Sequence, residues 1–219
     1  MNNKIVYFVR HGQSEANVSP VFQDPHAPLT EAGVAQARLV AERAKNVAFD
    51  LLVSSPYARA RSTAEAIQKA TGKIPEFSDL FIERVKPSKV AGRPYTDPEA
   101  LQLCREWEET LYTSGTRVED GENFDDLVAR ADHALTFLER QNASSILVVS
   151  HGYFMRALFA RVLLGTHLTG DALRSFMQHS KTENAGLSAL TYDADSGNNI
   201  TLTENSWRLF VFNDHAHLG

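Results

Sequence analysis

Two short apolar runs, each ending at a histidine-glycine pair, constrain the fold of this chain most. Residues Ile5–Val9 and Ile146–Val149 contain only aliphatic or aromatic side chains. The first run is followed by Arg10-His11-Gly12 and the second by Ser150-His151-Gly152. Continuous apolar runs of this length are typical of strands that are buried on both faces of a parallel sheet. We therefore expect an α/β fold with these two strands near its centre.

Segments with helical periodicity separate the apolar runs. Thr30 is a typical helix N-cap residue, Ser55-Pro56 predicts the start of a second helix that ends at Gly72, and residues 123–141 form a clear amphipathic helix. The alternation of strands and helices predicts a three-layer αβα sandwich around a mostly parallel sheet. The other expected strands are residues 49–53, 186–192, 200–203 and 207–212, with the last two paired, and the other expected helices are 99–112, 152–164 and 171–179.

The middle of the chain breaks the regular pattern. Residues 74–121 include Pro75, Pro87, Pro94 and Pro98 and show weak periodicity. We expect a single domain over residues 1–219, with a small lid lobe inserted at about residues 79–121. The last residues, Asp214–Gly219, are expected to form a frayed tail.

Composition excludes several classes of partner. The chain of 219 residues has 22 Lys and Arg against 27 Asp and Glu, a formal charge of −5, and no long basic run that could form a nucleic-acid surface. No apolar stretch is long enough to span a membrane, so we expect a cytoplasmic protein. The single cysteine, Cys104, excludes an internal disulfide and a cysteine metal site. Trp207, Phe210 and Phe212 belong either to the core or to an edge strand in a homodimer.

The residues that follow the expected strands carry the chemistry. Ligands of open α/β sheets bind beyond the carboxyl ends of the strands, and these ends would bring Arg10, His11 and His151 together. Arg59 would join them from the first turn of the helix after the second strand. A cation is unfavourable at that positive end of a helix, whereas a bound phosphate would be held by both the guanidinium and the backbone N–H groups.

Two histidines at matching strand ends favour phosphoryl chemistry. A neutral imidazole is a competent nucleophile toward phosphorus when its other nitrogen donates to a fixed acceptor. Gly12 and Gly152 would let the backbone turn sharply after each histidine. The remaining histidines have ordinary explanations on the surface or in the tail, and only His26 is placed to reach the mouth of the site.

Five ordered motifs resemble those of the histidine phosphatase superfamily, which includes the cofactor-dependent phosphoglycerate mutases. They span residues 5 to about 190 and consist of Arg10–Asn17, Leu29–Ala37, Ser54–Ala64, Gly121-Glu122 with Arg130, and Val148–Gly152. The resemblance implies that His11 becomes phosphohistidine and that Arg10, Arg59 and His151 stabilise the phosphoryl oxygens. It further implies substrate contacts from Asn17 and Gly152, a proton donor at Glu83, and no metal or other cofactor.

Two assignments stay open at this stage. Glu122 rivals Glu83 as the acid, although a first-turn position in the helix that follows also explains Glu122. Arg84 belongs to a basic group with Lys86, Lys89 and Arg93, which either binds a second anionic group of the substrate or forms a solvated loop.

The function expected is hydrolysis of a small phosphomonoester through His11. The nearest alternative is a mutase-type transfer of the phosphoryl group to another hydroxyl, and the choice depends on how well the lid excludes water. The lobe is short and lacks the usual mutase pattern, which favours hydrolysis. A non-catalytic module that binds a phosphorylated ligand and a metal-dependent hydrolase are the more distant alternatives.

Overall fold

The computed structural model of the chain describes residues 3–22, 25–194 and 207–219. Within them a mixed six-stranded sheet has the order β3-β2-β4-β1-β5-β6. The first four strands in this order are parallel, whereas β5 runs antiparallel to β1, and β6 antiparallel to β5. The mostly parallel sheet is as predicted. Its strands are β1 (Lys4–Arg10), β2 (Leu51–Ser54), β3 (Pro75–Phe77), β4 (Ser145–Ser150), β5 (Leu187–Tyr192) and β6 (Trp207–Asp214).

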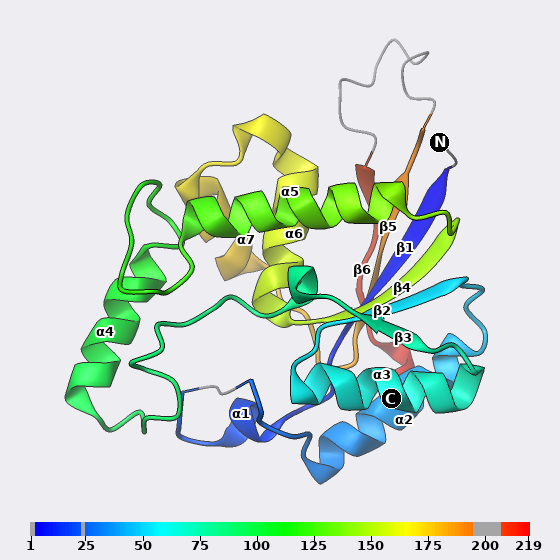
Figure 1. The fold of residues 1–219 in the computed structure, drawn as a ribbon, viewed down its shortest axis with the longest axis horizontal. Coiled ribbons are helices and arrows are strands. Elements are labelled where there is room, and N and C mark those ends of the chain that lie inside the picture. Colours follow the sequence, from blue (N-terminus) through cyan, green and yellow to red (C-terminus); the bar gives the residue numbers. More distant parts are fainter. Residues whose placement is uncertain (1–2, 23–24, 195–206) are drawn as a thin grey trace.

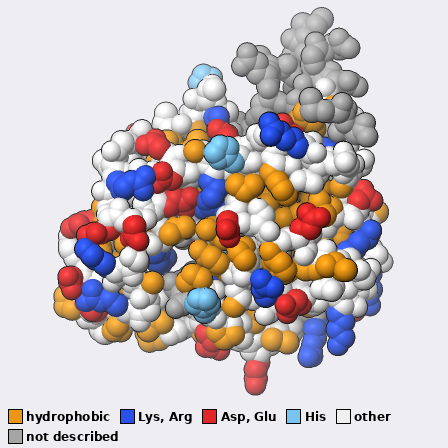
Figure 2. Space-filling view, viewed as in Figure 1, with side chains coloured by type: hydrophobic (Ala, Val, Ile, Leu, Met, Phe, Trp, Pro, Cys, Tyr) orange, Lys and Arg blue, Asp and Glu red, His pale blue; other side chains and the backbone are white. Residues whose placement is uncertain are grey.

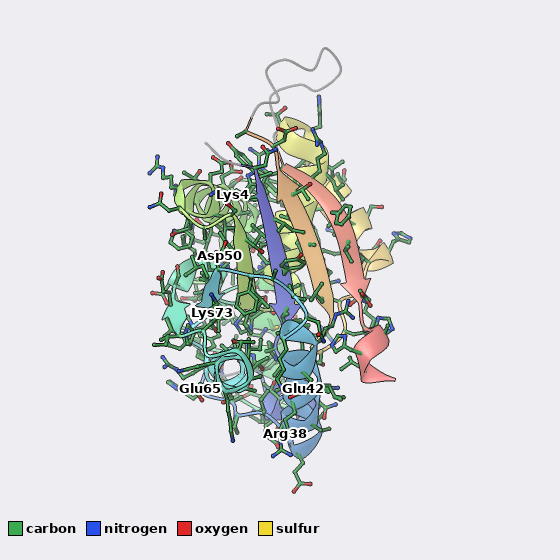
Figure 3. The ribbon with its side chains drawn as sticks, turned by 90° about the vertical axis from the view of Figure 1, so that its right-hand side faces the viewer. Lys4, Arg38, Glu42, Asp50, Glu65 and Lys73 are labelled. Carbon is green, nitrogen blue, oxygen red and sulfur yellow. The ribbon has the colours of Figure 1, made fainter. Side chains whose placement is uncertain are left out.

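Helices cover both faces of the sheet and confirm the three layers (Figure 1). Three helices pack on one face against the larger core: α5 (Phe124–Arg140), α6 (Gly152–Leu164) and α7 (Gly170–His179). The opposite face packs against α2 (Glu31–Ala44) and α3 (Ala58–Thr71). Successive side chains of the central strand β4 point to opposite faces and so enter both cores, since Val148 lies in one and Val149 in the other. In Figure 3, β1 runs from Lys4 toward α2, whose Arg38 and Glu42 lie on the outer surface.

Helix ends agree with the sequence at two places and disagree at a third. The Thr30 hydroxyl accepts a hydrogen bond from the Gly33 N–H and caps α2, and Gly72 ends α3 with a φ of 76°. The predicted start of α3 at Ser55-Pro56 is wrong, because the N-cap is Tyr57. Ser55 instead lies in the turn after β2, where its hydroxyl accepts from the Tyr57 N–H and contacts His151.

The C-terminal part departs from the expectation in two ways. β6 pairs with β5, and the strand expected at residues 200–203 lies outside the described residues. The predicted frayed tail is wrong, since Asp214 ends β6 and residues Ala216–Leu218 form the short helix η4. Arg43 of α2 binds both Asp214 and the Nδ1 of His217. These contacts hold the tail against the helix layer. At the free edge of the sheet, β6 leaves Phe210 69% exposed.

The residues between β3 and α5 form a small lobe. It contains the short helix η1 (Asp79–Phe81) and α4 (Pro98–Glu109), and α4 lies at the far side from the sheet (Figure 1). A separate small core joins Val90 and Ala100 of the lobe to Phe22, which follows the short helix α1 (Glu15–Val18). The lobe is therefore attached to the segment that follows the Arg10–Asn17 motif. No helix in the described ranges is long and apolar enough to cross a membrane.

Candidate active site

Two neighbouring parallel strands bring the two motif histidines side by side. β1 and β4 pair with Arg10 opposite Ser150, so the residues that follow, His11 and His151, leave the sheet at the same edge. Their ring centroids lie 5.0 Å apart, with the planes tilted by 59°. Both side chains are buried, His11 being 2% and His151 0% exposed. A phosphoryl group placed at this edge would touch both rings.

Arg59 reaches the same point from the first turn of α3. Its side chain is buried, and its Nε–H donates to the Nε2 atom of His11 over 3.2 Å. The guanidinium carbon lies 5.4 Å from the centre of the Tyr57 ring, which lines the same region. The structure thus places the cation of α3 directly against the first histidine.

The protonation of His11 follows from its contacts. Its Nδ1 lies 2.7 Å from the carbonyl oxygen of Gly12, so Nδ1 carries the hydrogen and donates it. Nε2 then keeps its lone pair, in agreement with its role as acceptor from Arg59. Burial, followed by the charges of Arg59 and Arg10, holds the pKa of His11 well below its usual 6.5. The neutral ring therefore presents a nucleophilic nitrogen at neutral pH.

Close backbone packing fixes the loop that carries His11. A Cβ atom on Gly12 would lie 2.4 Å from the carbonyl oxygen of Gly33, and one on Gly33 would lie 1.8 Å from that of Gln13. Only glycine fits at these two positions. The Thr63 hydroxyl adds a third contact, since it accepts from the Gly12 N–H and donates to the Arg59 carbonyl. The loop, α2 and α3 are consequently held as one unit.

Two buried nitrogens around the histidines have no partner among the described residues. Among the described residues, Arg10 Nε and His151 Nδ1 are the buried side-chain nitrogens or oxygens that make no hydrogen bond. The other end of Arg10 is anchored, because Nη1 donates to the Thr182 carbonyl over 2.6 Å. A Cβ on Gly152 would come within 3.1 Å of Arg10 Nε, so glycine leaves room there. Unpaired buried donors are costly unless a ligand satisfies them.

Two cavities meet at this cluster. The smaller, of about 140 Å³, is bordered by Arg10, His11 and Asn17, and the larger, of about 240 Å³, by Tyr57 and Arg59, while Glu83 lines both. The side-chain oxygen Oδ1 of Asn17 accepts from the backbone N–H and the hydroxyl of Ser14, so the side-chain NH₂ is the end that can donate to a ligand. The arrangement offers a neutral nucleophile, several donors and one carboxylate around a small polar hollow.

This geometry coincides with a family match over most of the chain. Residues 6–205 match the model of the histidine phosphatase superfamily (branch 1). The chain belongs to this superfamily. A similar protein is the one named "Probable phosphoglycerate mutase GpmB" of Yersinia pestis (strain Pestoides F), which is 33% identical over 164 residues, covering 72% of this chain and 74% of the relative.

Solved structures agree with the fold of the superfamily. The alpha-ribazole phosphatase from Shigella flexneri superposes with a TM-score of 0.75 at 22% identity, covering 96% of both chains. The mycobacterial glucosyl-3-phosphoglycerate phosphatase superposes with a TM-score of 0.73 at 23% identity, covering 98% of this chain and all of the other. At this identity the structures support the shared histidine phosphatase fold rather than a shared substrate.

Within this member of the superfamily, the two candidate acids have different surroundings. The Glu83 carboxylate accepts from the backbone N–H groups of Tyr153 and Phe154 at the start of α6 and faces both cavities. Glu122 instead forms a two-point ion pair with Arg130, with both N···O distances 2.7 Å, and accepts from the Val85 N–H. Glu83 thus borders the cavities, whereas the Glu122 carboxylate is bound to Arg130 and to the backbone of the lobe.

Arg84 borders the larger cavity, but the donors of its guanidinium are bound within the lobe. Its guanidinium is buried against the Trp107 ring at 3.8 Å and donates to the Glu122 and Trp107 carbonyls, to Thr110 and to Glu108. These contacts hold the guanidinium at the centre of the lobe. A substrate contact from the guanidinium is therefore not supported. The sequence could not show these contacts, because the partners of Arg84 are distant along the chain and meet it only in the folded lobe.

The rest of the basic group is also occupied within the lobe. Lys89 pairs with Glu119, and Arg93 pairs with Asp97 and Glu99. Figure 2 shows acidic and basic side chains lying next to one another over this part of the surface. The Lys86 ammonium lies 4.9 Å from the Trp107 ring and borders the larger cavity. The solvated-loop interpretation therefore describes Lys89 and Arg93, whereas Lys86 and Arg84 both border the larger cavity.

Sequence reasoning missed three supporting residues. Ser55 contacts His151, Thr63 joins the His11 loop to α3, and the Asn184 side chain donates to the His11 carbonyl over 2.9 Å. Ser55 and Thr63 belong to a quoted motif, so their positions were visible although their contacts were not. Asn184 lies between α7 and β5, and no motif in its neighbourhood predicted a contact with the site.

The histidines outside the motifs do not gather at the site. His26 and His133 are exposed, and His217 binds Arg43 and the Ala185 carbonyl near the tail. In the described ranges, no three His, Cys, Asp or Glu side chains are grouped as a metal site.

Proposed function

We propose that this histidine phosphatase hydrolyses a small phosphomonoester through a phosphohistidine on His11. The observation that carries the proposal is a pair of buried nitrogens without a partner, Arg10 Nε and His151 Nδ1, which as donors would bind an oxyanion beside a neutral His11 whose Nε2 is unprotonated. A phosphoryl group would satisfy these donors while its phosphorus meets the nucleophile. Small cavity volumes of about 140 and 240 Å³ support a substrate of limited size.

In the first step, the Nε2 lone pair of His11 forms a bond to phosphorus as the bond to the ester oxygen breaks. The guanidinium of Arg59 moves from Nε2 to a phosphoryl oxygen, where it joins Arg10 and His151 in stabilising the developing charge. Glu83, as its carboxylic acid, donates its proton to the leaving oxygen, and the alcohol departs. Asn17 and the Gly152 backbone N–H complete the donors around the phosphoryl group.

In the second step, water replaces the histidine. The Glu83 carboxylate takes a proton from the water as its oxygen attacks phosphorus. The nitrogen–phosphorus bond breaks, its electron pair returns to Nε2 of His11, and inorganic phosphate leaves. Glu83 is again protonated, so the cycle closes without a redox partner.

A mutase-type reaction is the second candidate, and one observation favours it. The Yersinia relative with 33% identity carries the name of a phosphoglycerate mutase. A mutase differs only in the second step, where a substrate hydroxyl rather than water accepts the phosphoryl group. The lobe over the larger cavity decides how much water reaches the phosphohistidine, and its short length favours hydrolysis.

The test is a panel of small phosphomonoesters assayed with the wild type and the His11→Ala variant. We expect phosphate release from several esters and a loss of at least about 10⁴-fold in the variant, because the nucleophile is removed. Interconversion of 2- and 3-phosphoglycerate without phosphate release would instead establish the mutase.

Two further outcomes separate the remaining alternatives. A non-catalytic binding module would show neither turnover nor a covalent adduct in intact-mass spectra after brief exposure to an activated phosphate donor. A metal-dependent hydrolase would lose activity in a chelator, whereas the proposed chemistry keeps full activity there.

A further inference from the structure

One buried contact of His151 is not used by the mechanism described above. The Ser55 hydroxyl lies 2.8 Å from Nε2 of His151, and both side chains are 0% exposed. Ser55 comes from the turn after β2 and His151 from the end of β4, so the contact joins two neighbouring strand ends. A ring nitrogen that is bound in this way must either donate or accept, and that choice determines where the imidazole carries its hydrogen.

The hydrogen count around Ser55 decides the direction. A hydroxyl can accept two hydrogen bonds but donates only one. The Ser55 oxygen already accepts from the Tyr57 N–H over 3.3 Å. In the described part of the chain, His151 Nε2 is the one acceptor within reach of the Ser55 hydroxyl hydrogen. If Nε2 donated instead, a buried hydroxyl hydrogen would be left without a partner, which is unfavourable.

Nε2 of His151 therefore accepts, and the hydrogen of the neutral ring resides on Nδ1. This is the same Nδ1 that is buried without a partner. The charged groups that act on the ring include the guanidiniums of Arg59, Arg10 and Arg130, so an anion is the complement of its environment. A ring with its hydrogen on Nε2 would turn a lone pair toward that anion and repel it.

We propose that Ser55 is a positioning residue that holds His151 in the Nδ1–H tautomer, so that His151 donates a hydrogen bond to a phosphoryl oxygen. The inference rests on the proposed phosphoryl-transfer function. The two histidines then share one tautomer and use it in opposite ways. His11 donates its Nδ1–H to the Gly12 carbonyl and attacks with Nε2, whereas His151 accepts from Ser55 at Nε2 and donates its Nδ1–H to the phosphoryl oxygen.

Tyr57 restrains the same ring from the side. Its ring packs edge-on against His151, with centroids 5.3 Å apart and planes at 67°. This contact fixes the plane of the imidazole but does not distinguish its two nitrogens. The tautomer thus depends on the hydroxyl of Ser55, and a variant that keeps a hydroxyl should keep it.

The primary test reads the tautomer directly in the free protein, by long-range proton–nitrogen NMR correlations of the histidine rings, with His151 assigned through the His151→Gln variant. We expect Nδ1–H in the wild type and in Ser55→Thr, and a mixture or the Nε2–H form in Ser55→Ala. The neighbouring Ser54→Ala is the matched control, because Ser54 is equally buried but its hydroxyl donates to the Ser55 carbonyl. An Nε2–H ring in the wild type, or an unchanged ring in Ser55→Ala, overturns the proposal.

Kinetics supply an independent readout. We expect Ser55→Ala to lower kcat about 10- to 100-fold, Ser55→Thr to stay within about threefold of wild type, and the double variant Ser55→Ala/His151→Gln to be no slower than His151→Gln alone. A further loss in the double variant means that Ser55 acts by another route and contradicts the proposal. If Ser55→Ala fails to fold, the wild-type tautomer and Ser55→Thr still decide. A correct tautomer in a wild type that turns over no ester refutes the proposed function and leaves the tautomer assignment intact.

Discussion

The Nε–H of Arg59 donates to Nε2 of His11 across 3.2 Å, so the guanidinium lies against the nitrogen that attacks phosphorus in the proposed mechanism. The contact keeps that nitrogen unprotonated, and it must be exchanged for a phosphoryl oxygen when substrate binds. In this mechanism Arg59 acts both on the protonation of the nucleophile and on the charge of the transition state.

Replacing Arg59 with glutamine should separate these two effects. We expect kcat/KM to fall about 10²- to 10³-fold, because one charged donor to the phosphoryl oxygens is lost. Burial is the first cause of the low pKa of His11 and the Arg59 charge is the next, so the variant should raise that pKa. The acid limb of the pH–rate profile should therefore move to higher pH. A profile that moves in the other direction would contradict this effect of the Arg59 charge on His11.

Stability should fall in mild acid because two histidines are buried as neutral rings. Burial, followed by the charge of Arg59, holds the pKa values of both His11 and His151 well below 6.5 in the folded protein. The unfolded chain then binds more protons below about pH 6.5, so the stabilisation is complete above this pH and is lost as the pH falls below it. Urea unfolding between pH 5 and 8 would measure the slope, and a His11→Gln/His151→Gln variant should show a smaller one.

Glutamine substitutions at the two candidate acids should have opposite consequences. Glu83→Gln should lower kcat about 10²- to 10⁴-fold with little change in stability, because the group lies at the cavities and supplies the proton. Glu122→Gln should lower stability by about 3 kcal/mol, since it leaves the Arg130 guanidinium without its carboxylate in a largely buried pair. Thermal melts and steady-state assays on both variants test the pair, and catalytic loss confined to Glu122→Gln would reverse the assignment.

A single methyl group at Gly33 should disturb the nucleophile from the neighbouring helix. The added Cβ would lie 1.8 Å from the Gln13 carbonyl, in the loop that carries His11, so backbone must shift. We expect Gly33→Ala to lose about 1–3 kcal/mol of stability and to lower kcat more than it raises KM. Ala32→Ser, at an exposed position of the same helix, is the control and should leave both quantities unchanged. A Gly33→Ala enzyme with wild-type stability and rate would show that the loop tolerates this displacement.

Short-range patterns predicted the layered fold and the centre of the site. The apolar runs before His11 and His151 indicated buried parallel strands, and parallel strands of one sheet end at the same edge, so the two rings were expected to meet. The position of Arg59 followed from a helix that begins just after a strand. These features could be predicted because each depends on a few adjacent residues and on a general rule of sheet geometry.

Tertiary packing decided the rest. Glu83, Arg84 and Glu122 are three charged residues near one lobe, and their sequence neighbourhoods do not reveal that Glu83 faces the cavities while Arg84 and Glu122 are enclosed by Trp107 and Arg130. Ser55 looked like a helix cap, and its contact with His151, 96 residues later, became visible only in the folded chain. The sequence by itself thus determined which residues stand at the strand ends, whereas folding determined which buried donors are satisfied, because hydrogen bonds and burial depend on neighbours that are distant along the chain.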